Sequence, residues 1–159
     1  MEFTGERLVL GQTDKELEIE HINRYKFAQQ FVTKKRVLDA ARGTGYGTQL
    51  LAQYAVSAVG VDISEEAIEY ACEQCQSDKI SFCVASVEKL PFPDASFDVV
   101  VSFETLEHID EKMQTRFLGE IKRVLSPQGI LVMSTPNHSI YCKRGVNSFH
   151  VKELEFDEF

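Results

Sequence analysis

The chain has 159 residues, of which 43% are hydrophobic and 26% charged, and its net charge at pH 7 is −8. These values are ordinary for a globular protein, and we expect one domain over residues 1–159. A pI near 5.0 is unfavourable for nucleic-acid binding, which needs a basic face. No stretch is long and apolar enough for a membrane helix, and the charged start does not resemble a signal peptide, so the expected location is cytoplasmic.

Strand and helix patterns alternate along the chain. An irregular arm over residues 3–11 precedes a first helix over residues 14–32. The apolar residues of that helix recur at three-to-four spacing, at Ile19, Ile22, Tyr25, Ala28, Phe31 and Val32. Strands are predicted over residues 36–40, 57–63, 80–85, 97–103 and 130–134. Further helices are predicted over residues 46–54, 65–76 (with Ser64 as N-cap) and 111–125, and a turn over residues 126–129.

This alternation predicts right-handed crossovers and a parallel sheet, which makes the fold class α/β and Rossmann-like. Ligands of such sheets bind beyond the carboxyl ends of the strands. We therefore expect a cofactor-binding core over residues 34–137, preceded by an arm and helix (1–33) and followed by a substrate-side tail (138–159).

A glycine-rich turn follows the first strand, with Gly43, Gly45 and Gly47 at alternate positions. Glycines let the backbone approach a ligand closely, and the amides that open the next helix carry partial positive charge. Asp62 comes 19 residues after Gly43, at the end of the second strand, where a carboxylate can accept from two ribose hydroxyls. The pattern predicts a site for a nucleoside-bearing cofactor.

The glycine spacing separates two kinds of cofactor. A nicotinamide site has the pattern G-x-G-x-x-G, whereas here Thr48 follows three alternating glycines. Asp39, just before the turn, would repel a pyrophosphate. An NAD-dependent oxidoreductase is therefore a less favoured alternative.

With Asp39, the three glycines and Asp62 in place, the sequence resembles the class I S-adenosylmethionine-dependent methyltransferases. Three further segments resemble that family in the same order: residues 87–100 its loop into the fourth strand, residues 104–109 the segment after that strand, and residues 125–129 the turn before the fifth. The resemblance covers residues 37–137.

The resemblance implies S-adenosyl-L-methionine as the cofactor. By resemblance, Asp39 would orient the methionine ammonium, directly or through water. Asp62 would hold the ribose, and Phe103 or Glu104 would lie near the transferred methyl group. The full set of expected cofactor contacts is Asp39, Ala41, Gly43, Gly45, Asp62, Ile63, Ser86, Val87 and Phe103. No metal site is expected, because the C-x-x-C of Cys72 and Cys75 lies in a helical pattern without further ligands nearby.

The acceptor is expected to be a small molecule or a saccharide, methylated at oxygen or nitrogen. Residues 3–7 and 147–151 resemble methyltransferases of glycan and polysaccharide pathways. His108 and His150 are the candidate catalytic bases. The alternatives are a helix-capping role for His108 and a structural loop role for His150. Arg24 and Tyr25 could cover the cofactor, or their helix could simply pack on the sheet.

Two departures from the family leave a second function open. Ala41 replaces the first glycine of the pattern D-x-G-x-G-x-G, and Ser86 stands where the family often has an acid. A protein that binds S-adenosylmethionine without catalysis is therefore an alternative. The family's sheet has seven strands, and this chain is expected to have about five. The edge of the fifth strand would then be covered by the tail or by another subunit in a homo-oligomer.

Overall fold

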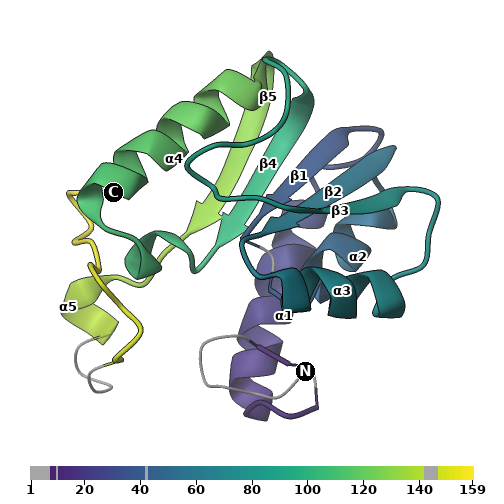
Figure 1. The fold of residues 1–159 in the computed structure, drawn as a ribbon. Helices are drawn as coiled ribbons and strands as arrows, with labels where there is room; N and C mark the ends of the chain where they lie inside the picture. The colour runs from purple at the N-terminus through teal and green to yellow at the C-terminus, as the bar shows by residue number, and fades with distance from the viewer. Residues whose placement is uncertain (1–7, 10, 42, 142–146) are drawn as a thin grey trace.

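The computed structural model describes residues 8–9, 11–41, 43–141 and 147–159 (Figure 1). Five parallel strands form one sheet in the order β3-β2-β1-β4-β5. The strands are β1 (Arg36–Ala40), β2 (Ser57–Asp62), β3 (Ile80–Val84), β4 (Phe97–Phe103) and β5 (Leu125–Ser134). The strand order reverses between β1 and β4, which places the expected ligand crevice at the carboxyl ends of these strands. The Rossmann-like α/β fold is thereby confirmed.

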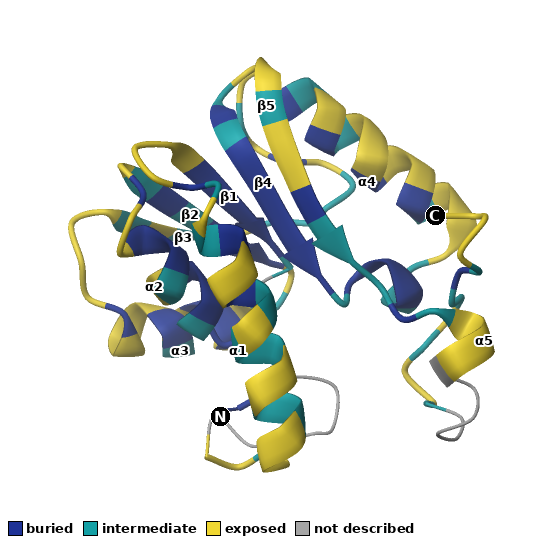
Figure 2. Ribbon diagram, turned by 180° about the vertical axis from the view of Figure 1, so that it is seen from behind, coloured by how far each residue is buried: buried dark blue, intermediate teal, exposed yellow. Residues whose placement is uncertain are grey.

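Helices cover both faces of this sheet. The helices of the described residues are α1 (Lys15–Gln29), α2 (Tyr46–Ala52), α3 (Glu65–Gln74), α4 (Glu111–Val124) and α5 (His138–Tyr141), with one 3₁₀ turn, η1 (Leu106–His108). Of these, α5 lies away from the sheet, in the C-terminal segment (Figure 1). Alternate residues of a strand point to opposite faces, and this divides the core in two. Val37 and Val101 pack with α1 and α2, whereas Leu38 and Val100 pack with α4 (Figures 1 and 2).

The helix starts follow from their capping residues. Asp14 accepts hydrogen bonds from the N–H groups of Glu16 and Leu17 at the start of α1. Ser64 accepts from the N–H of Ala67 at the start of α3, as predicted. Such side-chain oxygens satisfy amides that have no partner within the helix.

The described structure differs from the predicted elements in two places. Ile19 is 58% exposed, because only the second half of α1, with Tyr25 and Ala28, packs on the sheet. The predicted turn over residues 126–129 lies inside β5. Leu125 pairs with Phe97 and Ile130 with Val99, so the extra residues form a bulge in the ladder.

Three further expectations concern the N-terminal arm, the cysteines and membrane helices. Residues 3–7 and Cys142 lie outside the described residues. Cys75 is buried and Cys72 exposed, so one of the pair packs in the core. Among the described residues, no helix is both long enough and apolar enough to span a membrane.

Candidate functional site

A cavity of about 270 Å³ lies at the carboxyl ends of the central strands. Segments following β1, β2, β3 and β4 contribute to its wall, together with α1 and the residue Leu8. Seven of the nine expected cofactor contacts line this cavity: Ala41, Gly43, Asp62, Ile63, Ser86, Val87 and Phe103. Residues separated by more than 60 positions in the sequence are thus brought to one site by the parallel topology.

Asp62 joins the glycine-rich turn to the end of β2. Its Oδ2 accepts a hydrogen bond from the Gly43 N–H at 2.9 Å, and its Oδ1 accepts from the Ser64 N–H at 3.0 Å. Gly43 has φ +58° and Gly45 φ +86°, conformations that favour glycine. Gly45 immediately precedes α2 and shapes the turn without lining the cavity.

Asp39 lies behind the cavity wall rather than on it. Its carboxylate is fully buried and accepts hydrogen bonds from the Tyr25 hydroxyl at 3.1 Å and the Thr48 hydroxyl at 2.6 Å. Tyr25 itself lines the cavity, and its ring packs edge-on against Tyr46 and Phe103. Asp39 can therefore act on a ligand through Tyr25, and Tyr25 is a fixed part of the wall.

The β2–β3 side of the cavity is suited to a nucleoside. Ile63 lines it although its side chain is 70% exposed, which offers an apolar surface against which a flat ring could pack. The Asp62 carboxylate, which can accept from ribose hydroxyls, lies next to it in the chain. Ser86 and Val87 also line the wall, and the Ser86 hydroxyl oxygen accepts from the Glu88 N–H at 3.3 Å.

The β4 side of the cavity combines an aromatic ring with acidic and basic groups. Phe103 and Glu104 lie at the end of β4, and Glu104 adopts φ +51°, a strained conformation for a residue with a side chain. The Glu104 carboxylate accepts from the Ser134 hydroxyl at 2.6 Å and lies 3.5 Å from the Nε of Arg24. These contacts hold a charged side chain at the cavity wall.

The two candidate histidines differ in where they lie. His108 lines the cavity, and its Nδ1 is 2.9 Å from the carbonyl oxygen of Phe149. His150 does not line the cavity; its Nδ1 contacts Glu153, and its Nε2 is 2.9 Å from the Asn147 amide nitrogen. Of the two candidate bases, His108 thus lies at the cavity wall, whereas His150 lies away from it, in contact with Glu153 and Asn147.

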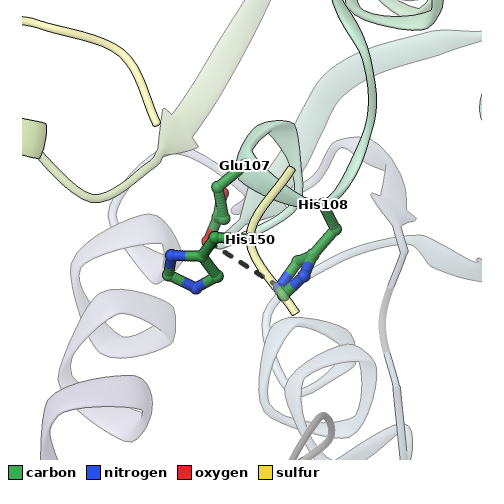
Figure 3. A group of neighbouring side chains, drawn as sticks. All are labelled: Glu107, His108 and His150. Atoms are coloured by element: carbon green, nitrogen blue, oxygen red, sulfur yellow. Dashed lines mark ion pairs between the residues drawn. The ribbon is translucent and has the colours of Figure 1, made fainter. Parts of the chain in front are cut away.

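Glu107 lies beside both histidines and was not predicted (Figure 3). It is 1% exposed, and one oxygen accepts from the Thr135 hydroxyl at 2.9 Å. The other oxygen, Oε1, accepts no hydrogen bond and lies 3.9 Å from the Nε2 of His108. Burial, and after it the charge of Glu104, raises the pKa of Glu107 to about 7.

Sequence reasoning also missed the cavity residues His21 and Tyr46. The Nδ1 of His21 is 3.3 Å from the Tyr46 hydroxyl. Burial and the charge of Arg24 lower the pKa of His21, and burial raises the pKa of Tyr46. His21 precedes Tyr25 by four positions and so shares its helix face, which was the signal available in the sequence.

Comparisons with known proteins agree with this geometry. A family model described as a methyltransferase domain matches residues 38–133. A probable S-adenosylmethionine-dependent methyltransferase of Mycobacterium tuberculosis is 35% identical over 98% of this chain and 57% of its own length. A probable tocopherol O-methyltransferase of Oryza sativa is 37% identical over 65% of this chain and 30% of its own length.

The fold also has solved counterparts. The PH0226 protein of Pyrococcus horikoshii has a TM-score of 0.74 and 28% identity, over 83% of this chain and 64% of the other. The chain spans a little over half the length of the mycobacterial relative. The matched domain covers most of the strands and the whole glycine-rich turn. The chain therefore belongs to the class I methyltransferases, whose cofactor is S-adenosylmethionine.

Proposed function

We propose that this chain transfers the methyl group of S-adenosylmethionine to an oxygen or nitrogen of a small-molecule or saccharide acceptor. The observation that carries the proposal is a single cavity that reaches from Asp62 and Ile63 to Phe103 and His108. It thus joins a wall suited to a nucleoside to a wall that carries a candidate base. As a domain assignment, we propose the cofactor-binding core over residues 34–137 and the acceptor side in residues 138–159.

The residues of the cavity suit this cofactor. Ile63 would flank the adenine, Asp62 would hold the ribose, and Gly43 would lie along the methionine portion. The acids suit a sulfonium cofactor, since Asp39 and Glu104 add negative charge beside a cationic group. S-adenosylmethionine supplies an activated methyl group when bound.

Positioning can supply much of the rate of such a transfer, because the methyl carbon is already activated. A base is needed where the acceptor loses a proton. The Phe149 carbonyl can only accept, so the proton of neutral His108 lies on Nδ1 and Nε2 carries the lone pair. His108 can thus accept a proton from a hydroxyl or amine at the cavity wall. The relative from Oryza, named as an O-methyltransferase, supports an oxygen acceptor.

Calorimetry with S-adenosylhomocysteine tests the cofactor, and NADH is the matched control ligand. We expect S-adenosylhomocysteine to bind and NADH not to bind. Transfer of tritium from labelled S-adenosylmethionine into a metabolite extract then tests catalysis. Binding without transfer in any extract would favour the non-catalytic alternative, and binding of NADH alone would overturn the proposal.

A further inference from the structure

Three potential metal ligands meet where η1 approaches the C-terminal segment (Figure 3). They are Glu107, His108 and His150, and each offers one ligand atom within 4.8 Å of the other two. Glu107 and His108 are adjacent in η1, whereas His150 arrives from more than 40 residues further along. The backbone fixes this meeting, because the Glu107 carbonyl accepts from the N–H groups of Val151 and Lys152 at 2.6 and 3.1 Å.

A buried carboxylate oxygen of Glu107 without a hydrogen bond indicates that this group binds a ligand. Its side chain is 1% exposed, and its Oε1 atom accepts no hydrogen bond although it is buried. A buried carboxylate oxygen without a partner is costly, and such atoms are rare in folded proteins. Oε1 points toward His108, since it lies 3.9 Å from the Nε2 atom of that ring. A cation between them would satisfy this oxygen.

The two histidines are held in the manner of metal ligands. A ligating histidine commonly donates its other ring N–H to a backbone carbonyl or a carboxylate. The Nδ1 of His108 has the Phe149 carbonyl as its partner, and the Nδ1 of His150 has the Glu153 carboxylate. Nε2 of each ring then carries the lone pair. A cation that uses the Nε2 of His150 replaces the Asn147 amide, which is 2.9 Å away.

The distances and donor types suit a transition metal. Two ligands at about 2.1 Å from one tetrahedral ion are about 3.4 Å apart, so Glu107 Oε1 and His108 Nε2, which are 3.9 Å apart, need to approach by about 0.5 Å. The outer limit of 4.8 Å for the group requires the ligand atoms to approach by up to about 1.4 Å when the ion binds. Two imidazoles and one carboxylate suit Zn²⁺, Fe²⁺ or Co²⁺ and leave coordination positions open. We propose that Glu107, His108 and His150 bind one divalent transition-metal cation at the edge of the cavity.

The cation would lie beside the proposed acceptor space, because His108 lines the cavity. There it would hold an acceptor oxygen and favour its deprotonated form. This consequence rests on the proposed function and favours a hydroxyl acceptor over an amine. His108 would then act as a metal ligand, and the cation would replace it in activating the acceptor.

Co²⁺ added to the chelator-treated full chain tests the site. We expect one Co²⁺ per chain by calorimetry, with visible absorption from the bound ion. Glu107→Gln, His108→Asn and His150→Asn should each weaken Co²⁺ binding at least tenfold. The matched control is His21→Asn, in the same cavity, and it should bind Co²⁺ like the unaltered chain. Absence of Co²⁺ binding, or binding that persists in Glu107→Gln, would overturn the proposal.

A second measurement uses the unaltered chain, so it tests the site even if one of the substitutions unfolds the protein. Zn²⁺ added to the unaltered ¹⁵N-labelled protein should shift the Nε2 resonances of His108 and His150 and leave those of His21 in place. Equal shifts at all three rings, or none, would contradict the site. Binding of S-adenosylhomocysteine is measured in the same samples, so a failure of the cation site is distinguished from a failure of the proposed function.

Discussion

Asp62 is held at the end of β2 by two backbone N–H groups, those of Gly43 and Ser64. Its carboxylate lines the cavity and is the acceptor we propose for the ribose. Asp62→Ala should weaken S-adenosylhomocysteine binding at least tenfold, which corresponds to about 1.4 kcal/mol. Asp94→Ala is the control, because it removes a surface carboxylate that contacts Arg123 and does not line the cavity. Unchanged affinity in Asp62→Ala, measured by calorimetry, would remove Asp62 from the site.

Ala41 adopts φ +58° at the position where the family pattern has glycine. A left-handed conformation costs a residue with a Cβ about 1–2 kcal/mol, while glycine adds flexibility to the unfolded chain. Ala41→Gly should therefore raise the free energy of unfolding by about 0.5–1 kcal/mol. Ala95, with φ +55°, lies outside the cavity lining, and Ala95→Gly should give a similar gain. Urea denaturation checks both; a loss of stability in each would refute the strain argument.

Among the packed elements, α1 can lie close to α2 because residue 47 of α2 is glycine. A Cβ at Gly47 would lie 2.0 Å from the Cζ of Tyr25, the residue that reaches both Asp39 and the cavity. Gly47→Ala should displace α1, lower the free energy of unfolding by about 1–3 kcal/mol and weaken S-adenosylhomocysteine binding. Gly119→Ala, in α4 with open space around it, is the matched control and should stabilise the chain by up to about 1 kcal/mol. Equal effects of the two substitutions on thermal melting would contradict this account.

β1 and β4 are tied together at their starts by Arg36 and Asp98. The guanidinium donates to both Asp98 oxygens, at 2.8 and 3.1 Å, and these bonds lower the pKa of Asp98 from 3.8 to about 2. Because the pKa is lower in the folded chain, the contribution of Asp98 to stability is present above about pH 4 and is lost as the pH falls toward 2. Asp98→Asn should melt at a lower temperature than the unaltered chain at pH 5, and the difference should narrow toward pH 2. A difference that stays constant with pH would contradict this role.

Much of the fold could be predicted from the sequence, because the strands and the glycine-rich turn are specified by residues that are close together in the chain. β1 and β4 were predicted to the residue, since buried parallel strands are nearly continuous apolar runs. The contact between Asp62 and Gly43 follows from their positions at the ends of neighbouring strands. The proximity of the Glu107 and His150 side chains could not be predicted, because it depends on how the C-terminal segment returns over η1.

Other errors also came from tertiary packing. Ile19 fits the periodicity of α1, yet the sheet ends before reaching it, so the side chain stays exposed. Residues 126–129 have turn chemistry, but pairing of Leu125 with Phe97 keeps them within β5. The hydrogen bond from the Tyr25 hydroxyl to Asp39 was likewise not predicted, because it depends on how α1 packs against the sheet. The spacing of apolar residues predicts which face of a helix or strand is apolar, but the tertiary packing determines which other element covers that face.

At the scale of the whole molecule, we expect the outer edge of β5 to favour self-association. Within the described part of the chain β5 pairs only with β4, and Ile130 and Leu131 are 40% and 38% exposed. An apolar edge strand is a template for pairing with another chain. We expect light scattering to show a concentration-dependent dimer, and Leu131→Lys to shift it toward monomer. Val84→Lys, on the opposite edge at β3 and 45% exposed, is the matched control and should leave the dimer intact. A monomer at all concentrations would show that the β5 edge does not pair.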